Sequence, residues 1–278
     1  MPEKRIIGKF VPKQNFDKEK FITEKISKTR LLCHEKIEEA NNIPNRIFRR
    51  ICLLSIIDSF AQEYSNYPTD SSGKTFCKFV LRFQNCCDYL ELIEPVTLFY
   101  DYEPKIPKNR KNNKLVKEFP HLFSDRLEVN ITDLGSLDEK LVSEVIRSGK
   151  AEEILSIIKR DCSEKEYKNY ERNHRMINLI YKMRSKAVHE LSPLGMESCY
   201  ALNEGLDKPH YRDVLRLFKS DDNIASSNVF ELVIPSDFIY LLTQNVVDNY
   251  LDWCDEEQRM PFENNSNFKR LVSISWRG

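Results

Sequence analysis

The residues best suited to chemistry in this sequence are Arg184 and His189, which stand five positions apart in the stretch Arg184-Ser185-Lys186-Ala187-Val188-His189. An arginine keeps its positive charge at any cellular pH, and its planar fork matches the geometry of phosphate. A histidine has an unperturbed pKa close to neutrality, so it can accept or release a proton there. Together they supply the groups needed to break a phosphodiester without a metal ion. The pair is therefore our candidate catalytic site.

The element that carries this pair is predicted to be a long amphipathic helix from Glu164 to Glu190. Downstream, Pro193 and Gly195 are typical of a helix end. The pair is therefore expected near the C-terminal end of the helix. Upstream of the pair, apolar residues recur at helical spacing, namely Met176, Ile177, Leu179, Ile180 and Met183.

The segment from Ile180 to Glu190 resembles the signature of the HEPN superfamily, in which an arginine is followed by four to six residues and then a histidine. A polar residue usually follows that arginine, and Ser185 fits this pattern. A second stretch, Cys52 to Phe60, is similar to an early core helix of such domains. The resemblance covers the helical portions of the chain. It implies a metal-independent endoribonuclease of antiviral defence or of a toxin–antitoxin system, or else a catalytically inactive binding module.

This resemblance also implies a mechanism in which RNA supplies its own nucleophile, the 2′-hydroxyl. His189 would act as the base or the acid, and Arg184 would stabilise the charge that builds up on phosphorus. No metal or other cofactor is expected. Two residues are candidates for a supporting role. Ser185 lies four residues before His189 on the same helix face, while Asp58 lies in an apolar helix and needs a partner such as Arg184 if it is buried.

The spacing of the pair bears on assembly. Five helical steps rotate by about 500°, which leaves the two side chains ~140° apart around one helix. A two-fold dimer would bring two such pairs to one cleft. We therefore expect RNA as the substrate and a homodimer as the assembly, and the resemblance is compatible with an antitoxin or regulatory partner.

Simpler roles for the same residues stay open. A histidine at a helix end often interacts with the terminal carbonyl groups. Arg184 could be an ion-pair partner of Glu190 or another acid, and His174 and Arg175 are interpreted as a solvated helix face. The alternatives to an enzyme are a silent HEPN module that binds RNA or a protein, and an unrelated helical scaffold.

Composition and periodicity predict a mainly α protein, a helical bundle with a long inserted loop and a small β-hairpin. Only 7 glycines among 278 residues favour helices over a β-sandwich. We interpret residues 1–278 as a single domain with an irregular insertion at about 95–136 and a hairpin region at about 205–235. The expected helices span 17–40, 44–64, 75–92, 137–147, 151–160, 164–190 and 237–254, and the expected strands 211–218 and 229–234.

The charges balance to a net charge of zero but are unevenly distributed. The first fifty residues are basic in balance, and the segment from Asp248 to Glu257 is acidic. Such asymmetry permits a basic groove on a neutral protein, although a single charged run is more often a solvated face. The candidate RNA-binding residues are the cations of the inserted loop, namely Lys108, Arg110, Lys111 and Lys114.

The compartment is predicted from the absence of targeting signals. No segment approaches the ~20 apolar residues of a membrane span, and the N-terminus lacks an apolar signal region. The 8 cysteines are scattered without a Cys-x-x-Cys pair, which is typical of free thiols rather than a zinc site. We therefore expect a cytoplasmic protein with no membrane contact.

Overall fold

The computed structural model describes residues 17–65, 71–102, 141–147, 149–190, 208–220 and 223–262, and for residues 100, 187–190, 213–220 and 223–231 it gives the backbone only. These ranges hold nine helices and one two-stranded antiparallel sheet, so the predicted mainly α fold is confirmed. The helices are α1 (Lys18–Asn41), α2 (Arg46–Tyr64), α3 (Ser72–Phe83), α4 (Pro95–Tyr102), α7 (Val142–Ile146), α8 (Lys150–Asp161), α9 (Glu164–Asn173), α10 (Met176–Glu190) and α11 (Ser236–Glu256), and the strands are β1 (His210–Ser220) and β2 (Asn223–Val233).

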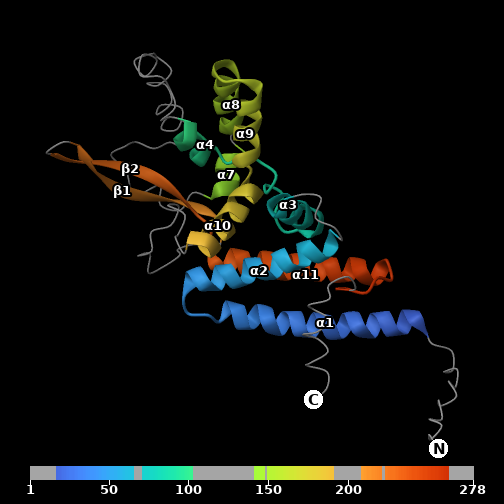
Figure 1. Cartoon of the computed structure of the whole chain (residues 1–278). Coiled ribbons are helices and arrows are strands. Elements are labelled where there is room, and N and C mark those ends of the chain that lie inside the picture. The colour runs from blue at the N-terminus through green and yellow to red at the C-terminus, as the bar shows by residue number, and fades with distance from the viewer. Residues whose placement is uncertain are drawn as a thin grey trace, which may run out of the picture.

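The helices form a bundle with a smaller group of helices at one end. Helices α1, α2 and α11 pack on one another, and α3 and α10 pack on α2 (Figure 1). Helices α4, α8 and α9 contact each other away from α1, where they form the second group. The candidate catalytic helix α10 follows α9 directly, so it lies where the two groups join.

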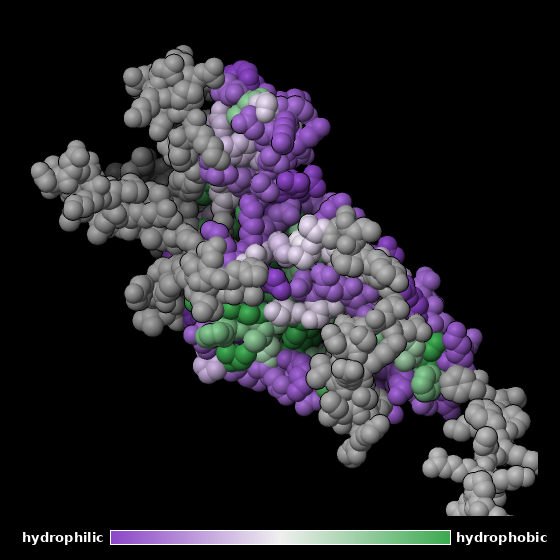
Figure 2. All heavy atoms as spheres, in the orientation of Figure 1, coloured by the Kyte–Doolittle hydropathy of each residue, from purple (hydrophilic) through white to green (hydrophobic). Residues whose placement is uncertain are grey.

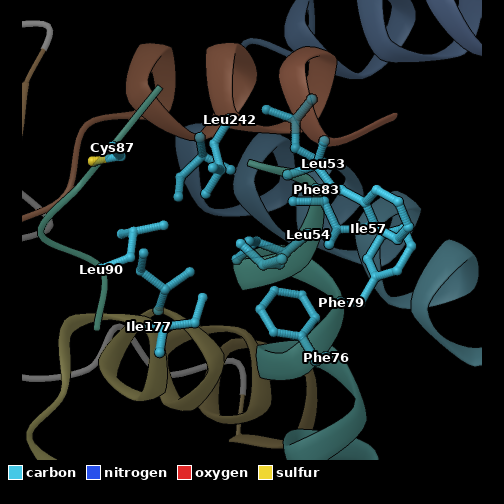
Figure 3. Packing of buried hydrophobic residues seen from close by; sticks show 14 of the residues in the cluster. Leu53, Leu54, Ile57, Phe76, Phe79, Phe83, Cys87, Leu90, Ile177 and Leu242 are labelled. Atoms are coloured by element: carbon cyan, nitrogen blue, oxygen red, sulfur yellow. The ribbon is translucent and has the colours of Figure 1, made fainter. Parts of the chain in front are cut away.

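The main hydrophobic core lies between α2, α3, α10 and α11. Figure 3 shows Leu54 and Ile57 of α2 meeting Phe76 and Phe79 of α3, and all four are at most 1% exposed. Burying one such side chain contributes about 1.5–3 kcal/mol. Ile177 of α10 joins the same cluster, so the core fixes the first turn of the candidate catalytic helix.

A second hydrophobic cluster holds the smaller group of helices together. Its buried residues come from α4, α8 and α9, and the ring of Tyr102 meets that of Tyr170 edge to face at 5.8 Å. Figure 2 shows that the outer surface over α8 and α9 is mainly hydrophilic, as expected of short amphipathic helices that bury one face.

Helices α1, α2 and α9 begin at side-chain caps that the sequence encodes. Asp17 accepts a hydrogen bond from the backbone N–H of Lys20, and Asn45 accepts two at the start of α2. Ser163 and Glu166 form a reciprocal capping box at the start of α9. The last helix, which we predicted over 237–254, begins one residue earlier at Ser236, and its N-cap residue is Pro235.

Helix α3 is shorter than predicted. We expected a helix over 75–92, but it ends at Phe83, and Gln84 is extended with ψ 140°. Two side chains of α11 bond to the backbone at this point. Asn249 donates to the carbonyl of Phe83 at 2.6 Å, and Asn245 accepts from the N–H of Asn85 at 2.9 Å. These contacts replace the helical hydrogen bonds that the sequence pattern had suggested.

The predicted helix over 164–190 is two helices, α9 and α10, that are separated at His174 and Arg175. The segment 90–94, which begins as a turn, bonds to the backbone at this break. The N–H groups of Met176 and Ile177 donate to the carbonyls of Leu92 and Leu90, and His174 accepts from Glu94. Our interpretation of His174 as solvated is wrong, because the residue is 3% exposed.

The predicted insertion and hairpin differ from the structure in their limits. Part of the expected irregular stretch 95–136 is helix α4, and residues 103–136 lie outside the described residues. The hairpin is confirmed, with strands longer than expected that pair in register from His210 with Val233 to Ser220 with Asn223. It joins the helices at its base, where Val142 donates to the carbonyl of Pro209.

The cysteines that the structure describes are all free thiols, as predicted. Burial raises the pKa of Cys33 and of Cys77 to about 12. Within the described ranges, no helix is both long enough and apolar enough to cross a membrane.

Candidate functional site

The first half of α10 is fixed against α3 by Tyr181. Its hydroxyl lies 2.8 Å from that of Ser72, and its ring lies 5.4 Å from the ring of Phe76. Gly73 leaves the space for this contact, because a Cβ atom there would lie 2.5 Å from Cε1 of Tyr181. Arg184 follows one turn later, so this packing sets where Arg184 meets α2.

Arg184 pairs with Asp58 of α2, as we had hypothesised. Its Nη2 atom donates to Oδ2 of Asp58 at 2.9 Å, and the two side chains are 17% and 16% exposed. The pair joins the candidate catalytic helix to the central helix of the core. Asp58 therefore has the partner that a largely buried carboxylate needs.

The contact between these two side chains is incomplete. Nε of Arg184 and Oδ1 of Asp58 are both buried, and neither has a hydrogen-bond partner among the described residues. A bidentate arginine–carboxylate pair would have used two parallel hydrogen bonds. The observed pair uses one, which leaves further N–H groups of the guanidinium for another acceptor.

The remaining residues of the predicted site are placed less fully. Ser185 is half-buried on α10. The backbone at His189 lies within α10, which is helical from Met176 to Glu190, and its side chain is outside what the structure describes. The proposed RNA-binding residues Lys108, Arg110, Lys111 and Lys114 also lie outside the described residues.

The uneven charges of the sequence are partly explained by pairing within the fold. Arg30 of α1 contacts Asp248 at 2.8 Å and Asp252 at 2.5 Å, both on α11. His34 lies 2.9 Å from the same Asp248. Basic residues of the N-terminal part and acidic residues of the C-terminal part thus face each other across α1 and α11. This pairing favours the interpretation of these runs as structural rather than as a basic groove.

Sequence reasoning missed a buried acidic group at the junction of the two helical groups. Glu94 is fully buried, and its carboxylate accepts hydrogen bonds from the backbone of Val96 and Thr97 and from the hydroxyl of Tyr211 at 2.5 Å. Burial raises the pKa of Glu94, and burial together with the adjacent carboxylate raises that of Tyr211. The signal was present, because an acidic residue directly before Pro95 is typical of a helix start.

Glu94 ties three elements to one point. Its side chain caps α4 and binds β1, and its backbone N–H donates to the carbonyl of His174, at the break before α10. The nearby ring of His174 is bonded through Nδ1 to the carbonyl of Tyr170 at 2.9 Å. This junction is structural, and it positions the start of the helix that carries Arg184.

Comparisons with known proteins do not test the resemblance. The sequence matches no protein-family model, and searches of curated proteins and of solved structures gave no match. The HEPN interpretation therefore stays a prediction that depends on the residues of α10. Among the described residues, no group of three or more His, Cys, Asp or Glu side chains is placed to hold a metal ion.

Proposed function

We propose that this protein is a metal-independent endoribonuclease of the HEPN type, with Arg184 and His189 as its catalytic residues. The observation that carries the proposal is the Arg-x4-His spacing on a helix that is continuous from Met176 to Glu190 and packed on the core. A rigid helix holds catalytic groups more precisely than a loop does. Single-stranded RNA or tRNA loops are the proposed substrates, in antiviral defence or a toxin–antitoxin setting.

The chemistry follows from the substrate. A base removes the proton of the 2′-hydroxyl, the oxygen attacks the adjacent phosphorus, and an acid protonates the departing 5′-oxygen. His189 serves as one of these two groups, and Arg184 stabilises the additional negative charge on the phosphoryl oxygens. The products are a 2′,3′-cyclic phosphate and a 5′-hydroxyl. Lys108, Arg110, Lys111 and Lys114 are proposed to contact the phosphates of longer RNA.

A homodimer is part of this proposal. Because α10 is helical across both residues, the offset of ~140° between positions 184 and 189 applies to it. One subunit therefore does not readily present both side chains to the same phosphate. A two-fold axis close to α10 would place Arg184 of one copy near His189 of the other.

A second candidate, the catalytically silent HEPN module, is favoured by one observation. Arg184 is 17% exposed and already paired with Asp58. An arginine whose charge is balanced in the fold is less available to a phosphate. In that case the helix would serve binding of RNA or a protein partner, without cleavage.

An activity assay separates the two candidates. Total RNA would be incubated with the protein in EDTA, comparing the wild type with His189→Ala. An enzyme degrades RNA under these conditions and loses that activity in the variant. Intact RNA with the wild type, combined with measurable RNA binding, would instead support the silent module. Equal cleavage by both proteins would refute the assignment of His189.

A further inference from the structure

We propose that Asp58 is a positioning residue that fixes the Arg184 guanidinium and lowers the positive charge that it presents to phosphate. This inference rests on the proposed function, because it concerns the same site. It adds a role for a side chain that contacts Arg184 but need not touch RNA. The first support is the contact between Nη2 and Oδ2 at 2.9 Å.

The carboxylate is attached to one of the most firmly packed parts of the molecule. Its neighbours on α2, Ile57 and Ala61, are both 0% exposed, and Leu54 is 1% exposed. A free arginine side chain carries about 2 kcal/mol of rotamer entropy. A hydrogen bond to a carboxylate on such a helix orders the guanidinium before any substrate arrives.

The single hydrogen bond also leaves donors for a ligand. A guanidinium has five N–H groups, and phosphate is commonly bound by two of them in parallel. The contact with Asp58 uses one N–H of Nη2 on a side chain that is 17% exposed, so the guanidinium is held without being saturated, although its Nε atom is buried. Asp58 thus orders Arg184 and still permits a phosphate contact.

The charge of Asp58 has the opposite effect on binding. A carboxylate at hydrogen-bond distance cancels most of the field of the arginine at an approaching phosphate. Removing that charge while keeping the size of the side chain should strengthen phosphate binding. The loss of orientation should slow the chemical step, because a misplaced group contributes less to the transition state. Tighter binding together with a slower chemical step would distinguish a positioning role of Asp58 from a merely structural one.

The experiment compares Asp58→Asn with the wild type on a single-stranded RNA. Binding is measured by fluorescence anisotropy with a 2′-O-methyl version of the RNA, which lacks the attacking hydroxyl, and cleavage is measured on the unmodified RNA. We expect about fivefold tighter binding at low salt and a log–log salt slope steeper by about 0.7. We also expect kcat to fall by about tenfold or more while KM falls.

Asp88→Asn is the matched control. Asp88 pairs with Arg147 at 2.7 Å rather than with Arg184, and the substitution makes the same change in net charge. It should leave kcat, KM and the salt slope unchanged. If Asp58→Asn behaves like this control, or if it lowers kcat while raising KM, the proposal is overturned. Should Asp58→Asn melt below the assay temperature, Asp58→Ser provides a smaller neutral side chain for the same comparison.

A chemical measurement separates this proposal from the proposed function. Phenylglyoxal modifies accessible arginines, and peptide mapping by mass spectrometry gives the rate at Arg184. That rate should rise severalfold in Asp58→Asn and stay unchanged in Asp88→Asn. A wild type that neither binds nor cuts RNA would refute the proposed function, and the role of Asp58 at phosphate with it. An unchanged labelling rate would show, independently of RNA, that Asp58 does not hold Arg184.

Discussion

At the scale of single residues, Arg184 has two roles, and a single substitution would affect both of them. It is the candidate catalytic cation, and it is also the partner of the largely buried Asp58. The sequence predicted this pairing because an acid within an apolar helix needs a partner. It could not predict that the pair uses one hydrogen bond only, since that depends on the distance between α2 and α10.

Two variants separate these roles. Arg184→Ala leaves the carboxylate of Asp58 without its partner, so we expect a loss of about 1–3 kcal/mol in the free energy of unfolding as well as lost cleavage. Arg184→Lys keeps a positive charge near Asp58 and should unfold close to the wild type. We nevertheless expect RNA cleavage by Arg184→Lys to be at least about tenfold slower than cleavage by the wild type, because an ammonium group lacks the bidentate fork of a guanidinium. Urea unfolding and initial cleavage rates measure the two effects, and full activity in either variant would contradict the assignment.

Glu94 gives a prediction about pH. Burial raises the pKa of its carboxyl in the folded protein, so the folded state holds this proton more tightly than the unfolded chain does. Its contribution to stability is therefore complete below the unfolded pKa of about 4.3 and is lost as the pH rises through the folded pKa. In Glu94→Gln this component is absent. The free energy of unfolding of the wild type, minus that of Glu94→Gln, should decrease from pH 4 to pH 8.

Urea unfolding at a series of pH values measures this difference. The glutamine loses one hydrogen-bond acceptor, which shifts the difference by a constant amount at every pH. The slope alone therefore reports the titration of Glu94. A difference that stays constant, or that increases with pH, would contradict a raised pKa at this position.

At the scale of elements, the existence of every described helix except α4 followed from the apolar periodicity, and several of the helix limits did not. The starts of α1 and α9 could be predicted from local caps such as Asp17 and Ser163. The end of α3 depends on Asn245 and Asn249, which lie far away in the sequence. The break before α10 depends on the segment 90–94. Such contacts between distant segments are not visible in a local pattern.

The packing of α10 on α3 gives a prediction at this scale. Gly73→Ala would place a Cβ atom 2.5 Å from the ring of Tyr181, so the ring must move and its hydrogen bond to Ser72 must weaken. Overpacking of this kind costs about 1–3 kcal/mol, although alanine favours a helix by up to about 1 kcal/mol. We expect a net loss of stability and slower RNA cleavage. The exposed Lys74→Ala on the same helix is the control for thermal unfolding, and a Gly73→Ala variant more stable than the wild type would contradict this packing.

At the scale of the whole molecule, the proposed site needs two copies of the chain. The sequence predicted a bundle with a hairpin, and the structure has both. Neither the local sequence pattern nor the structure of a single chain shows which surfaces of two copies would be in contact. The argument for a dimer therefore depends on the offset between positions 184 and 189 along a continuous α10.

Light scattering tests the assembly directly. We expect the mass of a dimer at micromolar concentration, because a composite site requires stable association. Mixing Arg184→Lys with His189→Ala should then restore part of the cleavage. In a mixed dimer, one of the two sites has the intact Arg184 of the His189→Ala copy and the intact His189 of the Arg184→Lys copy. A strict monomer that still cleaves RNA would remove the argument for a composite site.

The central claim is cleavage by 2′-hydroxyl attack at a site made of Arg184 and His189. The most direct measurement uses a defined single-stranded RNA in EDTA, with mass spectrometry of the products. We expect a 2′,3′-cyclic phosphate on one fragment and a 5′-hydroxyl on the other. We expect no cut where the nucleotide before the scissile bond is 2′-deoxy, and no products with His189→Ala. Products with a 5′-phosphate, or equal cleavage of the 2′-deoxy RNA, would contradict the central claim.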